Sequence, residues 1–77
     1  MKTTQYFEAM RVRPDRAIIQ DEWIQRVIDH PVKETIQRTA EFAVGPIAEM
    51  GGRYLRVILL LDGETVHNAF FDRSFTP

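Results

Sequence analysis

The sequence predicts an α+β fold, in which one or more N-terminal helices pack on a curled antiparallel sheet of three to four strands that ends in a β-hairpin. Three observations predict it. Apolar residues recur at helical spacing around Trp23, and after Pro31 they give way to segments typical of strands. Asp62-Gly63 then separates two apolar segments, a strong hairpin signal. No linker or repeat interrupts the chain, so residues 1–77 are assigned to one domain.

Size and composition narrow the class of protein. A chain of this length buries only about 60% of the surface that it exposes when unfolded, so its stability should depend on a partner or a second subunit. With 44% hydrophobic and 27% charged residues, the chain is expected to fold rather than to be disordered. Its net charge of −1 provides no broad basic field, so binding to nucleic acid would need a local cluster of cations.

Localisation is predicted from what the sequence lacks. The chain has no cysteine, which excludes disulfide frameworks and thiolate zinc sites. A secreted domain this small usually needs such cross-links, so we expect a cytoplasmic protein. The N-terminus has no apolar signal segment, and the longest aliphatic run, Val57–Leu61, is far shorter than the ~20 residues of a membrane span. We therefore expect no membrane partner.

The N-terminal segment Thr4–Met10 fits a short helix with Thr3 or Thr4 as its N-cap. Such a helix would turn its two aromatic residues and Met10 inward, although a short strand fits the same residues nearly as well.

Residues 13–16 are expected to form a turn, because Pro14 pushes the residue before it out of the helical region. Arg11, Arg13 and Arg16, in and just before this turn, could touch phosphates. Asp15 lies among them, however, and a solvated turn is the simpler interpretation.

The clearest helix begins at Asp21, which is a good N-cap residue. Its apolar stripe consists of Trp23, Ile24, Val27 and Ile28. Pro31 ends the helix near Asp29 or His30, because proline cannot continue the hydrogen-bonding pattern.

Two strands are expected between this helix and the hairpin. Residues 32–39 alternate imperfectly, with Glu34 interrupting the apolar face. Residues 42–50 form a second candidate, which Gly45-Pro46 should interrupt as an edge or a bulge. Gly51-Gly52 is expected to be a turn.

The hairpin strands, residues 54–61 and 64–71, flank a two-residue loop at Asp62-Gly63. On the core face this register pairs Leu59 with Val66, Val57 with Asn68 and Leu55 with Phe70. On the other face it pairs Ile58 with His67, Arg56 with Ala69 and Tyr54 with Phe71. The predicted core consists of Trp23, Ile24, Val27, Ile28, Leu55, Val57, Leu59, Val66 and Phe70.

One group of residues on the second hairpin face has the chemistry of a catalytic site. Tyr54, Arg56 and His67 lie on that face in the predicted register, and Arg56 and His67 are diagonal neighbours. Arginine can hold a phosphate and stabilise its transition state, histidine can act as general acid or base, and tyrosine can orient or donate. Arg53 and Arg73 are candidate substrate-binding residues. Together these residues could cleave RNA without a metal.

A structural interpretation of the same residues stays open. Tyr54 and His67 are also ordinary amphipathic sheet residues, and Arg56 could form an ion pair with Glu49. His30 and His67 are not spaced with acidic residues as metal ligands are, so neither a metal site nor a cofactor is expected.

A series of short motifs runs through most of the chain: Tyr6-Phe7, Met10, Arg13-Pro14-Asp15-Arg16, Ile19, Trp23-Ile24, Val27-Ile28, His30-Pro31, Gly52–Ile58 and Val66–Arg73. In this order they resemble small bacterial proteins grouped near the RelE- and BrnT-type toxins of toxin–antitoxin modules. The resemblance implies a helical N-terminal part followed by a curled antiparallel sheet. It also implies a ribonuclease toxin, dependent on the ribosome or free, that an antitoxin protein neutralises.

Two alternative functions follow, in order of preference. The first is the toxin-like component of a bacterial toxin–antitoxin module, a metal-independent endoribonuclease acting on mRNA, with an antitoxin and RNA as partners. The alternative is a non-catalytic interaction domain that binds a protein partner or its own copy. In both cases we expect a homodimer or a complex with a partner, because an open sheet leaves an unpaired edge.

Overall fold

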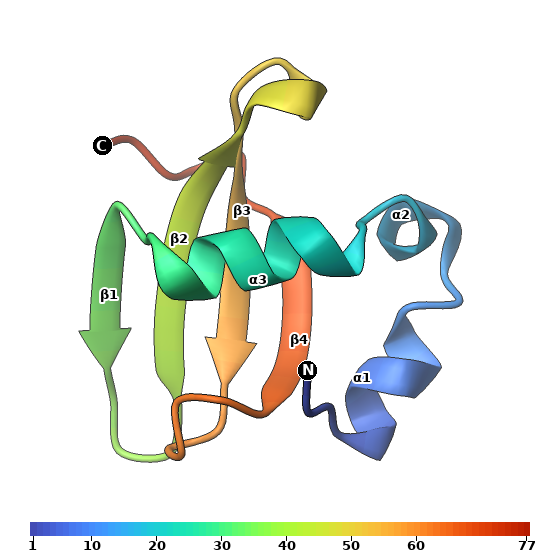
Figure 1. Cartoon of the computed structure of the whole chain (residues 1–77), viewed down its shortest axis with the longest axis vertical. Helices are drawn as coiled ribbons and strands as arrows, with labels where there is room; N and C mark the ends of the chain where they lie inside the picture. Colours follow the sequence, from blue (N-terminus) through green and yellow to red (C-terminus); the bar gives the residue numbers. More distant parts are fainter.

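The computed structural model describes residues 1–77 and contains three helices followed by a four-stranded antiparallel sheet (Figure 1). The elements are α1 (Gln5–Met10), α2 (Pro14–Ala17), α3 (Asp21–Asp29), β1 (Lys33–Ile36), β2 (Glu41–Ile47), a short 3-10 helix (Ala48–Met50), β3 (Arg53–Leu59) and β4 (Val66–Phe71). The strands lie in the order β1-β2-β3-β4, so the predicted α+β class is correct. None of the helices has the length and apolar character that a membrane span requires.

Helix α3 lies across one face of the sheet, while α1 and α2 lie beside β4 (Figure 1). The helix ends at Asp29, as Pro31 predicts, but Gln20 rather than Asp21 is the N-cap residue. Asp21 occupies the first turn instead, where its carboxylate binds the guanidinium of Arg11. Its negative charge is favourable at that end of a helix.

The core lies between α3 and the sheet. It comprises Phe7, Ile19, Trp23, Ile24, Val27, Ala43, Ile47, Leu55, Val57, Leu59, Val66 and Ala69. Seven of the nine predicted core residues are among them. Ile28 is only partly buried and packs against this cluster, and Phe70 is not part of it. The helix stripe and the inward face of β3 were thus predicted correctly, whereas the face of β4 was not.

A β-bulge in the hairpin explains the error at β4. Leu59 pairs with Val66 as predicted, but the register then shifts by one residue. Val57 consequently pairs with Ala69 rather than with Asn68. One extra residue on β4 is accommodated at this point, and a bulge of this kind reverses the facing of every residue beyond it.

The shift exchanges the two phenylalanines at the end of β4. Phe70 pairs with Arg56 on the face away from α3. Phe71 pairs with Leu55 and packs its ring against Trp23, with 6.4 Å between the ring centroids. The predicted pairs of Leu55 with Phe70 and Tyr54 with Phe71 are therefore wrong.

The loop of the hairpin is longer than predicted. Leu60 donates to the carbonyl of Thr65 (2.9 Å) and accepts from the N–H of Gly63 (3.0 Å), so residues 61–64 form the loop. Asp62 accepts from the hydroxyl of Thr65 and from two backbone N–H groups that follow it, which lowers the pKa of Asp62 to about 2. Gly63 has a φ of 70°, a conformation that glycine adopts without strain.

Strand β2 is continuous through Gly45-Pro46 and lies between β1 and β3, so the predicted interruption is wrong. Gly45 passes under α3, where an added Cβ would lie 3.2 Å from a methyl group of Val27. The carbonyl of Val44 accepts from the N–H of Val32, so the backbone polar groups of Val44 face β1. Pro46, two residues further on, faces the same side beyond the end of β1, where its missing N–H costs no ladder hydrogen bond.

The two edges of the sheet differ. Beside β4, Val66 donates to the carbonyl of Lys2 (2.8 Å) and accepts from the N–H of Thr4 (3.1 Å), so the N-terminal segment covers part of that edge. Thr4, one of the two candidate caps, is the N-cap of α1. On the opposite edge, all four residues of β1 are exposed, and this strand is shorter than the predicted 32–39.

Residues 13–16 do not form the simple turn that was predicted. Pro14 begins the short helix α2, where a proline is favoured because the first helical N–H has no partner. Arg16, in this helix, is half-buried, with its side chain directed toward β4 rather than into solvent.

Candidate functional site

His67 is held at the bulge by the N-terminal segment. Its Nδ1 lies 3.0 Å from the hydroxyl of Thr4, and the ring of Tyr6 stacks on it with 4.7 Å between centroids. The hydroxyl of Thr4 also accepts from the N–H of Phe7 as the cap of α1. His67 therefore helps to attach α1 to the edge of the sheet.

Arg56 lies on the opposite face of the sheet from α3 and binds Asp72. Its Nε donates to a carboxylate oxygen of Asp72 at 2.7 Å, and its Nη2 lies 2.7 Å from the same oxygen. The ion pair of Arg56 with Glu49, which was the alternative expectation, is not formed. Glu49 is instead held by both terminal nitrogens of Arg26 at 2.9 Å.

Asp72 organises the chain that follows β4. It accepts from the hydroxyl of Ser74 (2.7 Å) and from the backbone N–H of Ser74 (2.9 Å), as well as from Arg56. These hydrogen bonds, that of the Ser74 hydroxyl first and that of Arg56 next, lower the pKa of Asp72 to about 2. The carboxylate thus remains ionised at neutral pH and ties the C-terminal segment to the sheet.

The predicted trio is therefore divided. No hydrogen bond or ion pair joins Arg56 to His67, and each of them has other partners. The bulge is the physical reason, because the register that made them diagonal neighbours ends at Leu59.

Tyr54 lies instead with the two predicted substrate-binding arginines. A hollow of about 280 Å³, which we call the Tyr54 hollow, is lined by Arg53, Tyr54, Phe71, Asp72, Arg73 and Phe75. The ring of Phe75 packs against that of Tyr54, with 4.9 Å between their centroids. Arg56 lies behind the hollow, bound to Asp72.

The Tyr54 hollow carries positive charge. Arg53 has no carboxylate partner and lies over the ring of Phe71, 4.5 Å from its centroid. Arg73 likewise forms no ion pair. The one carboxylate present, Asp72, is already bound to Arg56 and Ser74. Two uncompensated guanidinium groups beside aromatic rings make a suitable environment for a phosphate.

Sequence reasoning missed Asp72 and Phe75. Asp72 could have been found, because an aspartate two residues before a serine often accepts from that residue's N–H in a turn. Phe75 had no such signal. Its contact with Tyr54 forms only because the C-terminal segment folds back over the sheet.

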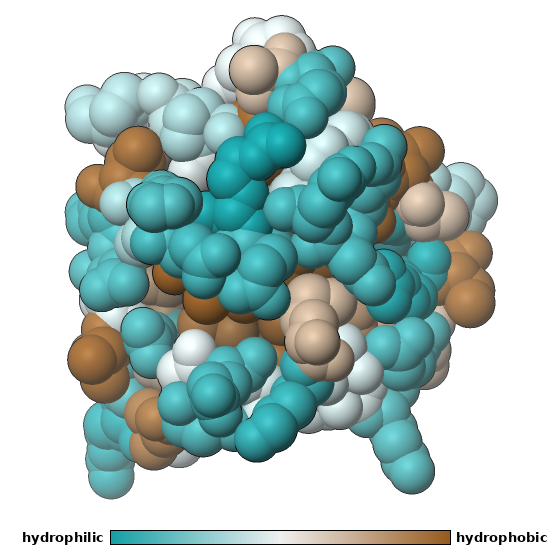
Figure 2. Space-filling view, in the orientation of Figure 1, coloured by the Kyte–Doolittle hydropathy of each residue, from teal (hydrophilic) through white to brown (hydrophobic).

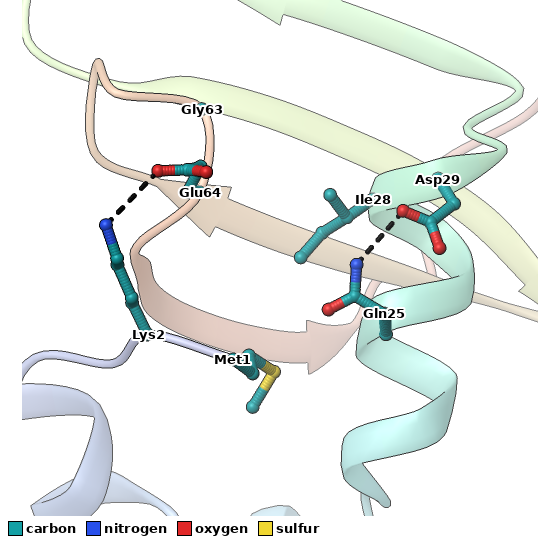
Figure 3. Close-up of a pocket in the computed structure, with 7 residues that line it drawn as sticks. All are labelled: Met1, Lys2, Gln25, Ile28, Asp29, Gly63 and Glu64. Atoms are coloured by element: carbon teal, nitrogen blue, oxygen red, sulfur yellow. Dashed lines mark hydrogen bonds and ion pairs between the residues drawn. The ribbon is translucent and has the colours of Figure 1, made fainter.

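A separate hollow opens on the α3 side of the molecule. Figure 2 shows apolar surface there, below the hydrophilic band that α3 presents. The hollow has a volume of about 400 Å³ and is lined by Met1, Lys2, Gln25, Ile28, Asp29, Gly63 and Glu64 (Figure 3). An ion pair between Lys2 and Glu64 (3.4 Å) and a hydrogen bond from Gln25 to Asp29 (3.0 Å) occupy its polar groups. None of these residues was a predicted site residue.

The structure contains no group of three or more His, Cys, Asp or Glu side chains arranged to hold a metal ion. No family model, no curated protein and no solved structure matches the chain.

Proposed function

We propose that the chain is the toxin-like component of a bacterial toxin–antitoxin module and cleaves RNA without a metal at the Tyr54 hollow. The observation that carries the proposal is the grouping of Arg53, Tyr54 and Arg73 in one hollow with no free carboxylate. The resemblance of the sequence motifs to RelE- and BrnT-type toxins supports the same function. An antitoxin protein is the expected partner, and cytoplasmic mRNA is the expected substrate.

The chemistry needs only water and the groups that the hollow presents. In metal-free cleavage the ribose 2′-oxygen attacks the adjacent phosphorus, the bond from phosphorus to the 5′-oxygen breaks, and a 2′,3′-cyclic phosphate remains. Water accepts the proton that the 2′-hydroxyl loses, because Asp72 is engaged by Arg56 and Ser74, and the 5′-oxygen gains one proton in its place. Arg53 and Arg73 would stabilise the charge on the pentavalent phosphorus, and the Tyr54 hydroxyl would donate to or orient an oxygen.

Arg56 and His67 have different places in this proposal. Arg56 acts as a positioning residue, because it holds Asp72 and through it the segment that carries Arg73. His67 is left out of the reaction, because its ring is engaged with Thr4 and Tyr6.

The proposal predicts which substitutions slow RNA cleavage. Tyr54→Phe and Arg73→Gln should each lower the cleavage rate by about 10²-fold, the usual loss for an acid–base group or a charge-stabilising donor. The measurement is the cleavage of single-stranded RNA by purified protein in EDTA, alone and with ribosomes, together with growth on expression.

His67→Gln is the matched control and should cleave at nearly the wild-type rate. The opposite pattern, with His67→Gln inactive and folded while Tyr54→Phe stays active, would place the reaction elsewhere. Wild-type protein that neither slows growth nor cleaves RNA in either assay would refute the function itself.

A second candidate function is favoured by the free edge of β1. An interaction domain that pairs with a second copy would use this strand, where Ile36 is 73% exposed. In that case Arg56 and His67 are structural residues, as their internal contacts also permit.

A further inference from the structure

A second arginine-lined hollow adjoins the Tyr54 hollow. It has a volume of about 410 Å³ and is lined by Asp15, Arg16, Ile18, Arg53, Phe70, Phe71 and Arg73; we call it the Arg16 hollow. Arg53, Phe71 and Arg73 line both hollows. The two hollows therefore adjoin each other across these three residues, beside the end of β4 that the N-terminal segment does not cover.

Arg16 is held in place from several sides. Only 17% of its side chain is exposed. Its Nη1 donates to the side-chain oxygen of Asn68 at 2.6 Å and approaches the carbonyl of Ala69 at 3.5 Å, while the guanidinium lies over the ring of Phe70, 5.3 Å from its centroid. A guanidinium fixed in this way loses little conformational freedom when it binds an anion.

Its charge is not fully compensated. The Nε of Arg16 is buried and has no hydrogen-bond acceptor, although a carboxylate oxygen of Asp15 lies 3.4 Å away. That carboxylate is shared with Arg13, whose Nε lies 3.6 Å from its other oxygen. Because Asp15 is the only acidic side chain that lines the hollow, three arginines outweigh it.

The bulge completes the site. It brings Asn68 to a position where its side-chain oxygen accepts both from Arg16 and from the N–H of Ala69. The backbone N–H of Asp72 donates to the carbonyl of Tyr54 and so faces β3. Because alternate residues of a strand face opposite sides, the N–H of the preceding residue, Phe71, faces the outer edge of β4. The hollow thus has a backbone donor beside its guanidinium groups, and both kinds of donor bind phosphate oxygens.

We propose that the Arg16 hollow is a second phosphate subsite, which binds the RNA backbone next to the phosphate held in the Tyr54 hollow. This inference rests on the proposed function. Arg16 binds substrate and takes no part in the bond-breaking step. Arg16 and Arg53 already lie over the rings of Phe70 and Phe71, so the rings position the guanidinium groups and the subsite contacts the phosphate backbone rather than the bases.

The test compares Arg16→Gln with Arg38→Gln, an exposed arginine without an ion pair in the β1–β2 turn, at the other end of the sheet. The probe is a 2′-O-methyl oligouridylate of about eight nucleotides, within the usual site size, which binds but is not cleaved. Arg16→Gln should weaken binding about tenfold and lower the slope of log K against log salt by about 0.7, the value of one phosphate on a single strand. Arg38→Gln should bind as the wild type does.

Two further measurements separate a binding role from a structural one. Arg16→Lys keeps the charge without the planar fork and should recover part of the affinity, and thermal unfolding checks that each variant is folded. In the wild type, inorganic phosphate should shift the NMR signals of the Arg16 Nε–H and the Phe71 amide, and chloride at equal ionic strength should not.

The outcomes distinguish this subsite from the proposed function. If the wild type binds the oligonucleotide and folded Arg16→Gln binds it equally well, the subsite is refuted while the Tyr54 hollow stands. If phosphate shifts both signals but the wild type does not bind the oligonucleotide, RNA is refuted as the ligand, together with the proposed function.

Discussion

At the scale of single residues, Asp72 determines how the C-terminal segment meets the sheet. Its carboxylate joins Arg56 on β3 to the N–H and hydroxyl of Ser74. These contacts position Arg73 and Phe75, both of which line the Tyr54 hollow. One carboxylate therefore links the C-terminal part of the site to the sheet.

The depressed pKa of Asp72 predicts an acid-dependent part of the stability. Its folded pKa is about 2, below the ordinary value of 3.8. Its ionised form therefore stabilises the native state above about pH 4, and this stabilisation is lost as the pH falls toward about 2. In Asp72→Asn the free energy of unfolding should decrease less steeply over that range, measured by urea denaturation at several pH values. Asp62 and Glu49 also have pKa values of about 2, so the dependence should decrease rather than disappear.

A companion variant is Ser74→Ala, which removes the hydroxyl donor to Asp72 and should flatten the slope in the same direction by a smaller amount. An Asp72→Asn variant with the full wild-type slope would show that the contacts with Ser74 and Arg56 do not persist in solution.

At the scale of secondary-structure elements, the β-bulge in β4 decides which side chains enter the core. It leaves Val66 and Ala69 facing α3 although they are three residues apart, and it turns Phe70 to the other face. The same bulge places His67 against the N-terminal segment and Asn68 against Arg16. Bulges redirect side chains, and this one does so beside the candidate site.

This placement predicts unequal effects of two aromatic truncations. Trp23→Ala should cost about 3–5 kcal/mol of stability, because Trp23 is buried among core residues. Phe70→Ala should cost less than half as much, because Phe70 is half-buried on the other face. Urea denaturation measures both; if Trp23→Ala does not fold, Trp23→Phe replaces it. A Phe70→Ala variant as unstable as the Trp23 variant would support the bulge-free register.

At the scale of the whole molecule, the sheet has one protected and one open edge. The segment before α1 pairs with Val66 and covers part of β4. Strand β1 has no neighbour on its outer side, and both Val32, which precedes it, and Ile36, which ends it, are exposed. An antiparallel pair of β1 strands, one from each of two copies, would satisfy both edges about a two-fold axis.

We predict that the protein dimerises through β1. The hydrogen bond from Gln37 to Ala40 and the pairing of Thr35 with Phe42 direct alternate residues toward β2, so the N–H of Glu34 faces outward. Glu34→Pro removes that donor without breaking a bond to β2, and should convert a dimer into a monomer in sedimentation experiments at micromolar concentration. A wild-type monomer, or a dimer that Glu34→Pro does not weaken, would rule out this interface.

The sequence by itself determined the elements and most of the core. The helical stripe around Trp23, the stop at Pro31 and the Gly51-Gly52 turn depend on residues close together in the chain, and each is found as predicted. The same holds for the cap of α1, where Thr4 is the one of two candidate residues that caps the helix. The α+β class and the inward face of β3 also follow from local periodicity.

Only the tertiary structure decided the register of β4 and the composition of the site. The hydrophobic pattern of β4 does not distinguish Phe70 from Phe71. The bulge that sends them to opposite faces arises where β4 meets both β3 and the N-terminal segment. Arg16 and Phe75 reach the site from segments far apart in the sequence, by contacts with Asn68 and Tyr54 that no local pattern encodes. Periodicity reports which face of an element is apolar, whereas a one-residue shift in pairing, which depends on the neighbouring segments, decides which side chains meet.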